Sequence, residues 1–132
     1  MNDCIFCKII NGEIPSYKVY EDDDVFAFMD ISPVSAGHVL VIPKKHAQDI
    51  FEIDDESHGK VQKVVKKLAH KIVDKLGAKG VNIINNNKAE AGQTVFHYHV
   101  HIIPRYDEND KLELKFNPDS AVVIEEVFEK IK

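Results

Sequence analysis

The sequence has no long apolar run. None of its stretches approaches the roughly 20 consecutive apolar residues of a membrane-spanning helix. Its start, Met1-Asn2-Asp3, also lacks the basic cluster and apolar segment of a targeting sequence. We therefore expect a soluble, cytoplasmic protein with no membrane partner.

A surplus of basic residues is missing as well. The chain carries 17 lysines and arginines against 22 aspartates and glutamates, a net charge of -5. Non-specific binding to nucleic acids relies on a basic surface, so we expect no nucleic-acid partner. Any nucleotide ligand is expected to be small and held locally.

Glycine-rich phosphate-binding motifs are absent too. The sequence has neither a Walker loop nor a dinucleotide-binding fingerprint, and it contains no repeat and no low-complexity segment. Phosphate oxygens could instead be held by backbone amides and a hydroxyl at Gly92, Gln93 and Thr94. With 132 residues and 44% apolar content, the chain is expected to form one domain, residues 1–132, around a single core.

The most informative stretch is residues 95–103, Val-Phe-His-Tyr-His-Val-His-Ile-Ile. Its strict alternation predicts a strand with three histidines on one face, namely His97, His99 and His101. Phe96 and Tyr98, with the β-branched residues between, are expected to pin the opposite face against the core.

A row of imidazoles suggests chemistry. At about 7 Å, two imidazolium charges repel by roughly 2 kcal/mol, so some of the set should stay neutral near pH 7. A neutral imidazole can attack phosphorus without a separate base. The alternatives are a polar strand face that happens to be histidine, and a metal-binding ribbon.

The remaining pattern predicts an α+β domain with an antiparallel sheet of about five strands. Short strands are expected at 17–21, 25–28, 38–42 and 81–85, with an acidic turn at 22–24. A short helix at 5–10 should end at Asn11-Gly12, one long helix should cover 54–76, and an amphipathic helix should follow residue 120. The core is expected to span about residues 4–106, with residues 107–132 as a C-terminal extension.

The stretch Ala91–Arg105 resembles the signature of the histidine triad family. The likeness extends to Gly12-Glu13-Ile14-Pro15, Phe28-Met29-Asp30-Ile31 and the segment Gly37–His46, in the family's order. The resemblance implies the family's HIT fold, a two-fold homodimer, and hydrolysis of a small purine nucleotide. Its nearest branch is that of the bacterial nucleoside phosphoramidases.

The resemblance also implies roles for individual residues. His99 would attack the α-phosphorus of a nucleoside phosphoramidate, His101 would contact the phosphate oxygens or the leaving group, and His38 would orient the triad. The remaining expected contacts are ribose on Asp30, the base among Phe6, Phe28 and Ile31, and polar nucleotide contacts at Asn86, Gln93 and Thr94.

The chain has two cysteines, Cys4 and Cys7. They could be a redox pair, half of a zinc site or two unremarkable thiols, and zinc is favoured because almost nothing precedes the first cysteine. Tetrahedral zinc needs two further nitrogen or sulfur ligands. Similarity to bacterial triad proteins implies that these are His46 and His97, with zinc in a structural role.

One departure and several alternatives remain. Many relatives carry glycine two residues after Asn86, where this chain has Lys88, which lacks glycine's freedom at positive φ.

The alternative functions are hydrolysis of dinucleoside polyphosphates, nucleotide binding without turnover, and zinc binding.

Overall fold

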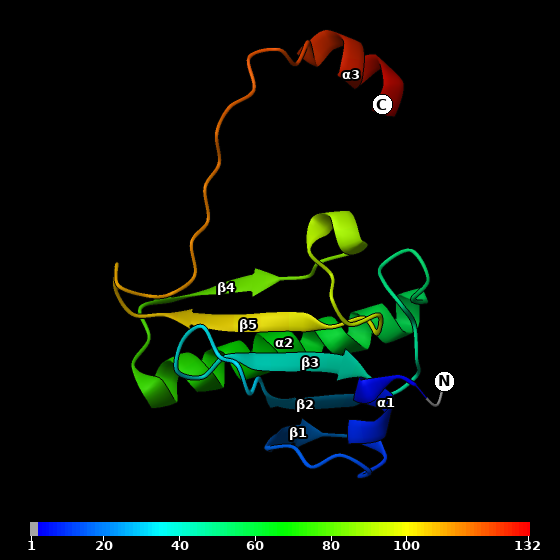
Figure 1. The fold of residues 1–132 in the computed structure, drawn as a ribbon, viewed down its shortest axis with the longest axis vertical. Coiled ribbons are helices and arrows are strands. Elements are labelled where there is room, and N and C mark those ends of the chain that lie inside the picture. The colour runs from blue at the N-terminus through cyan, green and yellow to red at the C-terminus, as the bar shows by residue number, and fades with distance from the viewer. Residues whose placement is uncertain (1–2) are drawn as a thin grey trace.

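The computed structural model describes residues 3–132. Its centre is a five-stranded antiparallel sheet in the order β1-β2-β3-β5-β4 (Figure 1). The strands are β1 Lys18–Glu21, β2 Val25–Met29, β3 Val39–Pro43, β4 Gly80–Ile84 and β5 Val100–Arg105. The expected α+β class and strand number are confirmed.

The long helix α2, Asp55–Leu76, covers one face of the sheet. Its limits follow from local chemistry: the Asp54 side chain accepts a hydrogen bond from the Ser57 amide, and Gly77 ends the helix in the left-handed conformation. Three valines, one leucine and one isoleucine of α2 are buried against Val25, Ala27, Val39 and Val41. The prediction for this helix is confirmed.

The short helix α1, Ile5–Ile10, lies against the opposite face. Phe6 and Ile9 pack there on Phe26, Phe28 and Leu40, which alternate with the residues that face α2. In β5, His101 is opposite Leu40 in the β3 register and therefore belongs to the α1 face. The two faces of the sheet thus differ: α2 buries one, and the other combines apolar side chains with His101.

The prediction for the triad strand was wrong at its beginning. β5 starts only at Val100, and the residues before it, 95–99, form no ladder. Phe96, expected in the core, is 48% exposed. Alternation signals which residues face the same way, but it does not show whether a neighbouring strand is present to pair with them.

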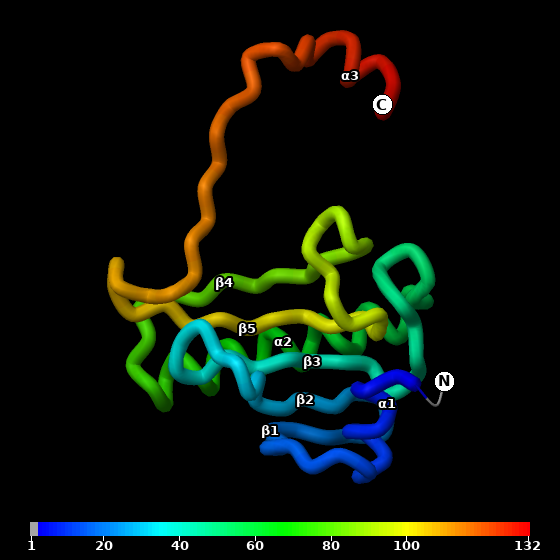
Figure 2. The backbone as a smooth tube through the Cα atoms, viewed as in Figure 1, coloured from blue at the N-terminus to red at the C-terminus, as the bar shows by residue number. Residues whose placement is uncertain are grey.

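The C-terminal extension leaves the body beyond β5. It runs past β4 and ends in α3, Ile124–Ile131, which lies away from the sheet (Figures 1 and 2). All residues of α3 are exposed, including its apolar face. Within residues 3–132, no helix is long and apolar enough to cross a membrane.

Candidate active site and metal centre

A pocket of about 390 Å³ opens on the α1 face of the sheet. His99 and His101 form its polar wall together with Asp30 and Thr94. The rest is mainly apolar, from Ile5, Phe6, Ile9, Ile14, Pro15, Phe28, Met29, Ile31, Leu40 and Val95. A concave apolar site with a few convergent polar groups is the usual form of a small-molecule site.

Hydrogen bonding fixes the tautomer of His99. Its Nδ1 lies 2.7 Å from the backbone oxygen of His97. A carbonyl oxygen can only accept, so Nδ1 carries the proton, and in the neutral ring Nε2 keeps its lone pair. No hydrogen bond within the described chain engages Nε2, and the ring lines the pocket. His99 can therefore present an unprotonated nitrogen to a ligand.

A second chain of hydrogen bonds sets the tautomer of His101. The Val34 amide donates to Nδ1 of His38 at 3.2 Å, which leaves the proton of neutral His38 on Nε2. That Nε2–H lies 2.9 Å from Nδ1 of His101 and donates to it. Neutral His101 consequently carries its proton on Nε2 and is a hydrogen-bond donor. His99 and His101 thus have opposite tautomers, with ring centroids 5.1 Å apart.

Burial, more than mutual repulsion, keeps these rings neutral. It lowers the pKa of His101 to about 4, with the charges of His99 and His38 adding to the effect. Burial also lowers the pKa of His38 and His99, against the opposing influence of the Asp30 carboxylate. The expectation of neutral histidines holds, but its main physical cause is desolvation.

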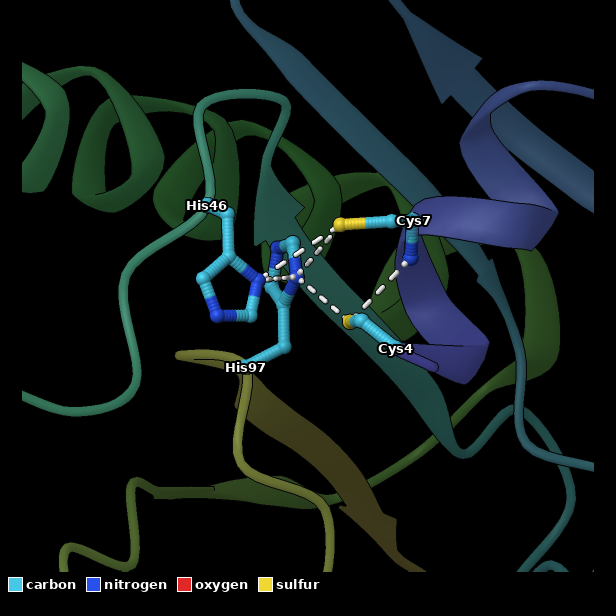
Figure 3. Close-up of side chains that lie close together, drawn as sticks. All are labelled: Cys4, Cys7, His46 and His97. Atoms are coloured by element: carbon cyan, nitrogen blue, oxygen red, sulfur yellow. Dashed lines mark hydrogen bonds between the residues drawn. The ribbon is translucent and has the colours of Figure 1, made fainter. Parts of the chain in front are cut away.

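His97 belongs to a different site. Its Nε2–H donates to the Pro43 oxygen at 2.8 Å, so the Nδ1 lone pair is free. Nδ1 faces Cys4, Cys7 and His46, which come from α1 and from the loop after β3 (Figure 3). It lies 3.3 Å from the Cys4 sulfur, 3.6 Å from the Cys7 sulfur and 3.1 Å from His46 Nδ1.

These four residues fit a zinc ion. Bonds of about 2.0 Å to nitrogen and 2.3 Å to sulfur give a tetrahedron with edges of roughly 3.3 to 3.8 Å, close to the separations in the cluster. Burial and the Cys4 thiol raise the pKa of the Cys7 thiol to about 11. Thiolates are therefore unfavourable here without a cation beside them. The four residues predicted as metal ligands are brought together as a set.

Comparison with known proteins places the chain in a family. The HIT domain profile matches residues 11–108. The chain belongs to the HIT domain family. An uncharacterized HIT-like protein of Methanocaldococcus jannaschii is 51% identical over 129 residues, with 98% of each chain covered. The adenosine 5'-monophosphoramidase hnt1 of Schizosaccharomyces pombe is 46% identical, covering 80% of this chain and 76% of its own length.

Solved structures agree with this assignment. A HIT family protein from Bacillus anthracis superimposes with a TM-score of 0.92 at 47% identity, covering 98% of this chain and 92% of its own. A structure described as a zinc-bound histidine triad family protein, from Mycobacterium smegmatis, has a TM-score of 0.80 at 38% identity and covers 89% and 85% of the two chains. The HIT fold is confirmed, and the names of the relatives support the Hint-like branch of the family.

Five of the seven predicted substrate contacts line the pocket of this HIT domain. They are Phe6, Phe28, Asp30, Ile31 and Thr94. One Asp30 oxygen accepts from the Ser32 amide at 2.8 Å, and the other lies 3.5 Å from His38 Nε2. Asp30 therefore caps its loop and also faces the histidines.

The other two, Asn86 and Gln93, do not line the pocket. Gln93 is 3% exposed, and its amide is already engaged: it accepts from the Lys88 amide and donates to the backbone oxygens of Gln48 and Val95. Its position supports a role in stabilising the loop and does not support direct contact with a nucleotide.

Sequence reasoning missed part of the lining and one buried contact. Leu40 and Val95 line the pocket. The register that sets Leu40 opposite His101 is not visible in the sequence, and neither is the course of the unpaired segment that carries Val95. Ile14 also lines the pocket, and its place in the family-like segment Gly12–Pro15 could have indicated this. His58 lies 2.8 Å from the hydroxyl of Tyr98, a contact that no motif in the sequence indicates.

Proposed function

We propose that this HIT domain is a hydrolase of nucleoside phosphoramidates, with purine nucleosides preferred, and that it acts at the α-phosphate through a nucleotidyl-histidine intermediate. The observation that carries the proposal is the tautomer of His99, whose Nε2 lone pair lies on the pocket side of a ring held at Nδ1. A neutral imidazole presented in this way needs no further base.

The opposite tautomer of His101 suits the leaving group. Its Nε2–H can donate to a phosphate oxygen or to the departing nitrogen, because His38 occupies Nδ1. Within hydrogen-bond reach, such a donor stabilises charge that develops as the phosphorus–nitrogen bond breaks. His38 acts through His101 and is thus a positioning residue.

The reaction then has two steps. Nε2 of His99 attacks the α-phosphorus, the bond to the leaving nitrogen breaks, and the amine departs with a proton taken from solvent, while the Nε2–H of His101 donates a hydrogen bond to a phosphate oxygen. Water next attacks the same phosphorus, the bond to His99 breaks, and a nucleoside monophosphate is released. The protons of that water pass to solvent, and His99 returns to its neutral form with the proton on Nδ1.

The apolar part of the pocket is assigned to the nucleoside. Phe6, Phe28 and Ile31 offer surfaces for a flat base, and the Asp30 carboxylate is placed to accept from ribose hydroxyls. The name of the Schizosaccharomyces pombe relative, adenosine 5'-monophosphoramidase, supports an adenine nucleotide.

The cluster Cys4, Cys7, His46 and His97 is assigned to structural zinc, in line with the zinc-bound relative. When bound, the ion would cross-link α1 to the segment that precedes β5. Because the His97 backbone oxygen also accepts from His99 Nδ1, the same segment aligns the proposed nucleophile.

Paired surface charges favour a small leaving group. The basic side chains of the family-like segments Gly37–His46 and Ala91–Arg105 all have acidic partners: Lys44 with Glu21 at 2.8 Å, Lys45 with Asp54 at 3.1 Å, and Arg105 with Asp110 at 3.0 Å. A dinucleoside polyphosphate carries several negative charges, and these paired side chains offer no unpaired cation to bind them. We therefore place this activity second.

The choice between these substrates is tested by their kcat/KM values at matched ionic strength. We expect the kcat/KM of adenosine phosphoramidate to exceed that of diadenosine polyphosphate. The reverse ratio would assign the other substrate class while leaving His99 as the nucleophile.

His99→Asn should lose turnover but still bind adenosine monophosphate. Retained turnover in that variant would contradict the mechanism, and a wild type that binds without turnover would make the domain a nucleotide-binding module.

A further inference from the structure

The segment that carries His97 and His99 has no sheet ladder to hold it. β5 begins at Val100, so strand pairing fixes His101 but neither of the two histidines before it. Backbone contacts are few: the Tyr98 amide donates to the Ala47 oxygen at 2.7 Å, and the Asn85 side chain donates to the His99 oxygen at 2.9 Å. Besides the hydrogen bonds of the His97 and His99 rings to backbone oxygens, the segment has one more fixed point, on the side away from the pocket.

The side chain of Tyr98 supplies that fixed point. His97 and His99 contact Phe6 on the α1 side, with ring centroids 5.9 and 5.2 Å away, while Tyr98 points to the other side, into the cluster beneath α2. Tyr98 is 1% exposed. A backbone rotation that moves the Tyr98 ring also moves His97 and His99, its neighbours in sequence.

Two residues of α2 hold the Tyr98 hydroxyl. Gln62 Nε2 donates to it at 3.3 Å, and the hydroxyl shares a second hydrogen bond, of 2.8 Å, with His58 Nδ1. The His58 and Tyr98 rings also meet edge to face, with centroids 5.8 Å apart. A buried hydroxyl is unfavourable without partners, so these bonds select one depth and one rotation for the ring.

We propose that His58 and Gln62 are positioning residues for His99: by holding the Tyr98 hydroxyl, they anchor to α2 the segment that aims His99 Nε2 into the pocket. This inference rests on the proposed function for its catalytic consequence. Its structural part, the alignment of the His99 ring, stands apart from any reaction. A misplacement of about 1 Å can cost 100-fold in rate, so the loss of one anchor should be measurable.

The test compares Tyr98→Phe and His58→Leu with His70→Leu, a control that removes an exposed histidine from the same helix. The formation rate of the nucleotidyl adduct is measured in single turnovers with adenosine phosphoramidate, and affinity is measured with adenosine monophosphate. Nitrogen-15 NMR of the imidazoles reports the tautomer of His99 without any turnover.

We expect both test variants to form the adduct roughly tenfold more slowly, with nucleotide affinity unchanged and a broadened or shifted His99 signal. The double variant should be no slower than the worse single variant, since both changes act on one hydroxyl. His70→Leu should match the wild type.

Wild-type adduct rates and an unchanged His99 spectrum in Tyr98→Phe would overturn the inference, even if the variant melts at a lower temperature. If the wild type forms no adduct at all, the proposed function fails. The NMR comparison still decides whether Tyr98 aligns His99.

Discussion

At the residue scale, each triad histidine is defined by what holds its other nitrogen. Carbonyl oxygens hold His97 and His99, and His38 holds His101, which leaves an Nδ1 lone pair on His97, an Nε2 lone pair on His99 and an Nε2–H on His101. The sequence predicts the three residues but not their tautomers. His97 is held by Pro43, 54 residues earlier in the chain, and no local pattern reports such a partner.

This arrangement predicts activity at unusually low pH. The donated bond from His38 to His101 requires a neutral His101, because a protonated Nδ1 could not accept. Burial lowers the pKa of His101 to about 4, so the ring stays neutral below the ordinary histidine value of about 6.5 and charges only as pH falls further. The acid limb of kcat/KM should lie below pH 6.5.

Asp30 provides a matched variant for that measurement. Its carboxylate raises the pKa of His38 and His101, so Asp30→Asn should move the acid limb to still lower pH, whatever it does to KM. An acid limb above pH 6.5 in the wild type, or an upward move in the variant, would contradict the assignment.

At the element scale, periodicity predicted most of the fold. α2 was found because apolar residues, a capping aspartate and a terminal glycine all agree. The start of β5 was predicted too early in the chain, because the alternation extends through Val95–His99 although no strand pairs with that segment. The site residues on α1 and β2 came from the family resemblance, and their convergence with β5 depends on sheet order, which no single segment encodes.

The loop before the triad contains a strained residue, as the sequence suggested. Lys88 has φ 81° and ψ 154°, a region open essentially to glycine and costing about 1 to 3 kcal/mol. Its ammonium lies 3.0 Å from the buried Asp49 carboxylate, which ties this loop to the one after His46.

We predict that Lys88→Gly is more stable than Lys88→Ala. Both variants lose the ion pair with Asp49, but only glycine relieves the backbone strain. Urea unfolding of the two variants, with the wild type as reference, measures the difference. Equal midpoints would mean that the loop adopts an ordinary conformation at residue 88.

The cluster of Cys4, Cys7, His46 and His97 connects α1 to the rest of the domain, and removing one of the proposed zinc ligands should loosen that link. We expect about one zinc ion per chain by elemental analysis after dialysis, and loss of both zinc and thermal stability in Cys4→Ser. A protein from zinc-replete growth that is metal-free, folded and active would refute the site.

At the scale of the whole molecule, a sheet edge and a helix face are left uncovered. The β4 edge is unpaired within residues 3–132, with Ile83 45% exposed, and the apolar face of α3 is free in the same part of the chain. Free strand edges invite pairing with another chain. The homodimer implied by the family resemblance therefore remains our prediction, and sedimentation at micromolar concentration tests it. A monomer there would exclude edge pairing.

The central claim is that His99 becomes covalently nucleotidylated. Brief mixing with adenosine phosphoramidate, denaturing quench and peptide mass mapping test it most directly. We predict a mass increase of one adenylyl group on the peptide that carries His99, and none in His99→Asn. An adduct on another residue, or turnover without any adduct, would contradict this account.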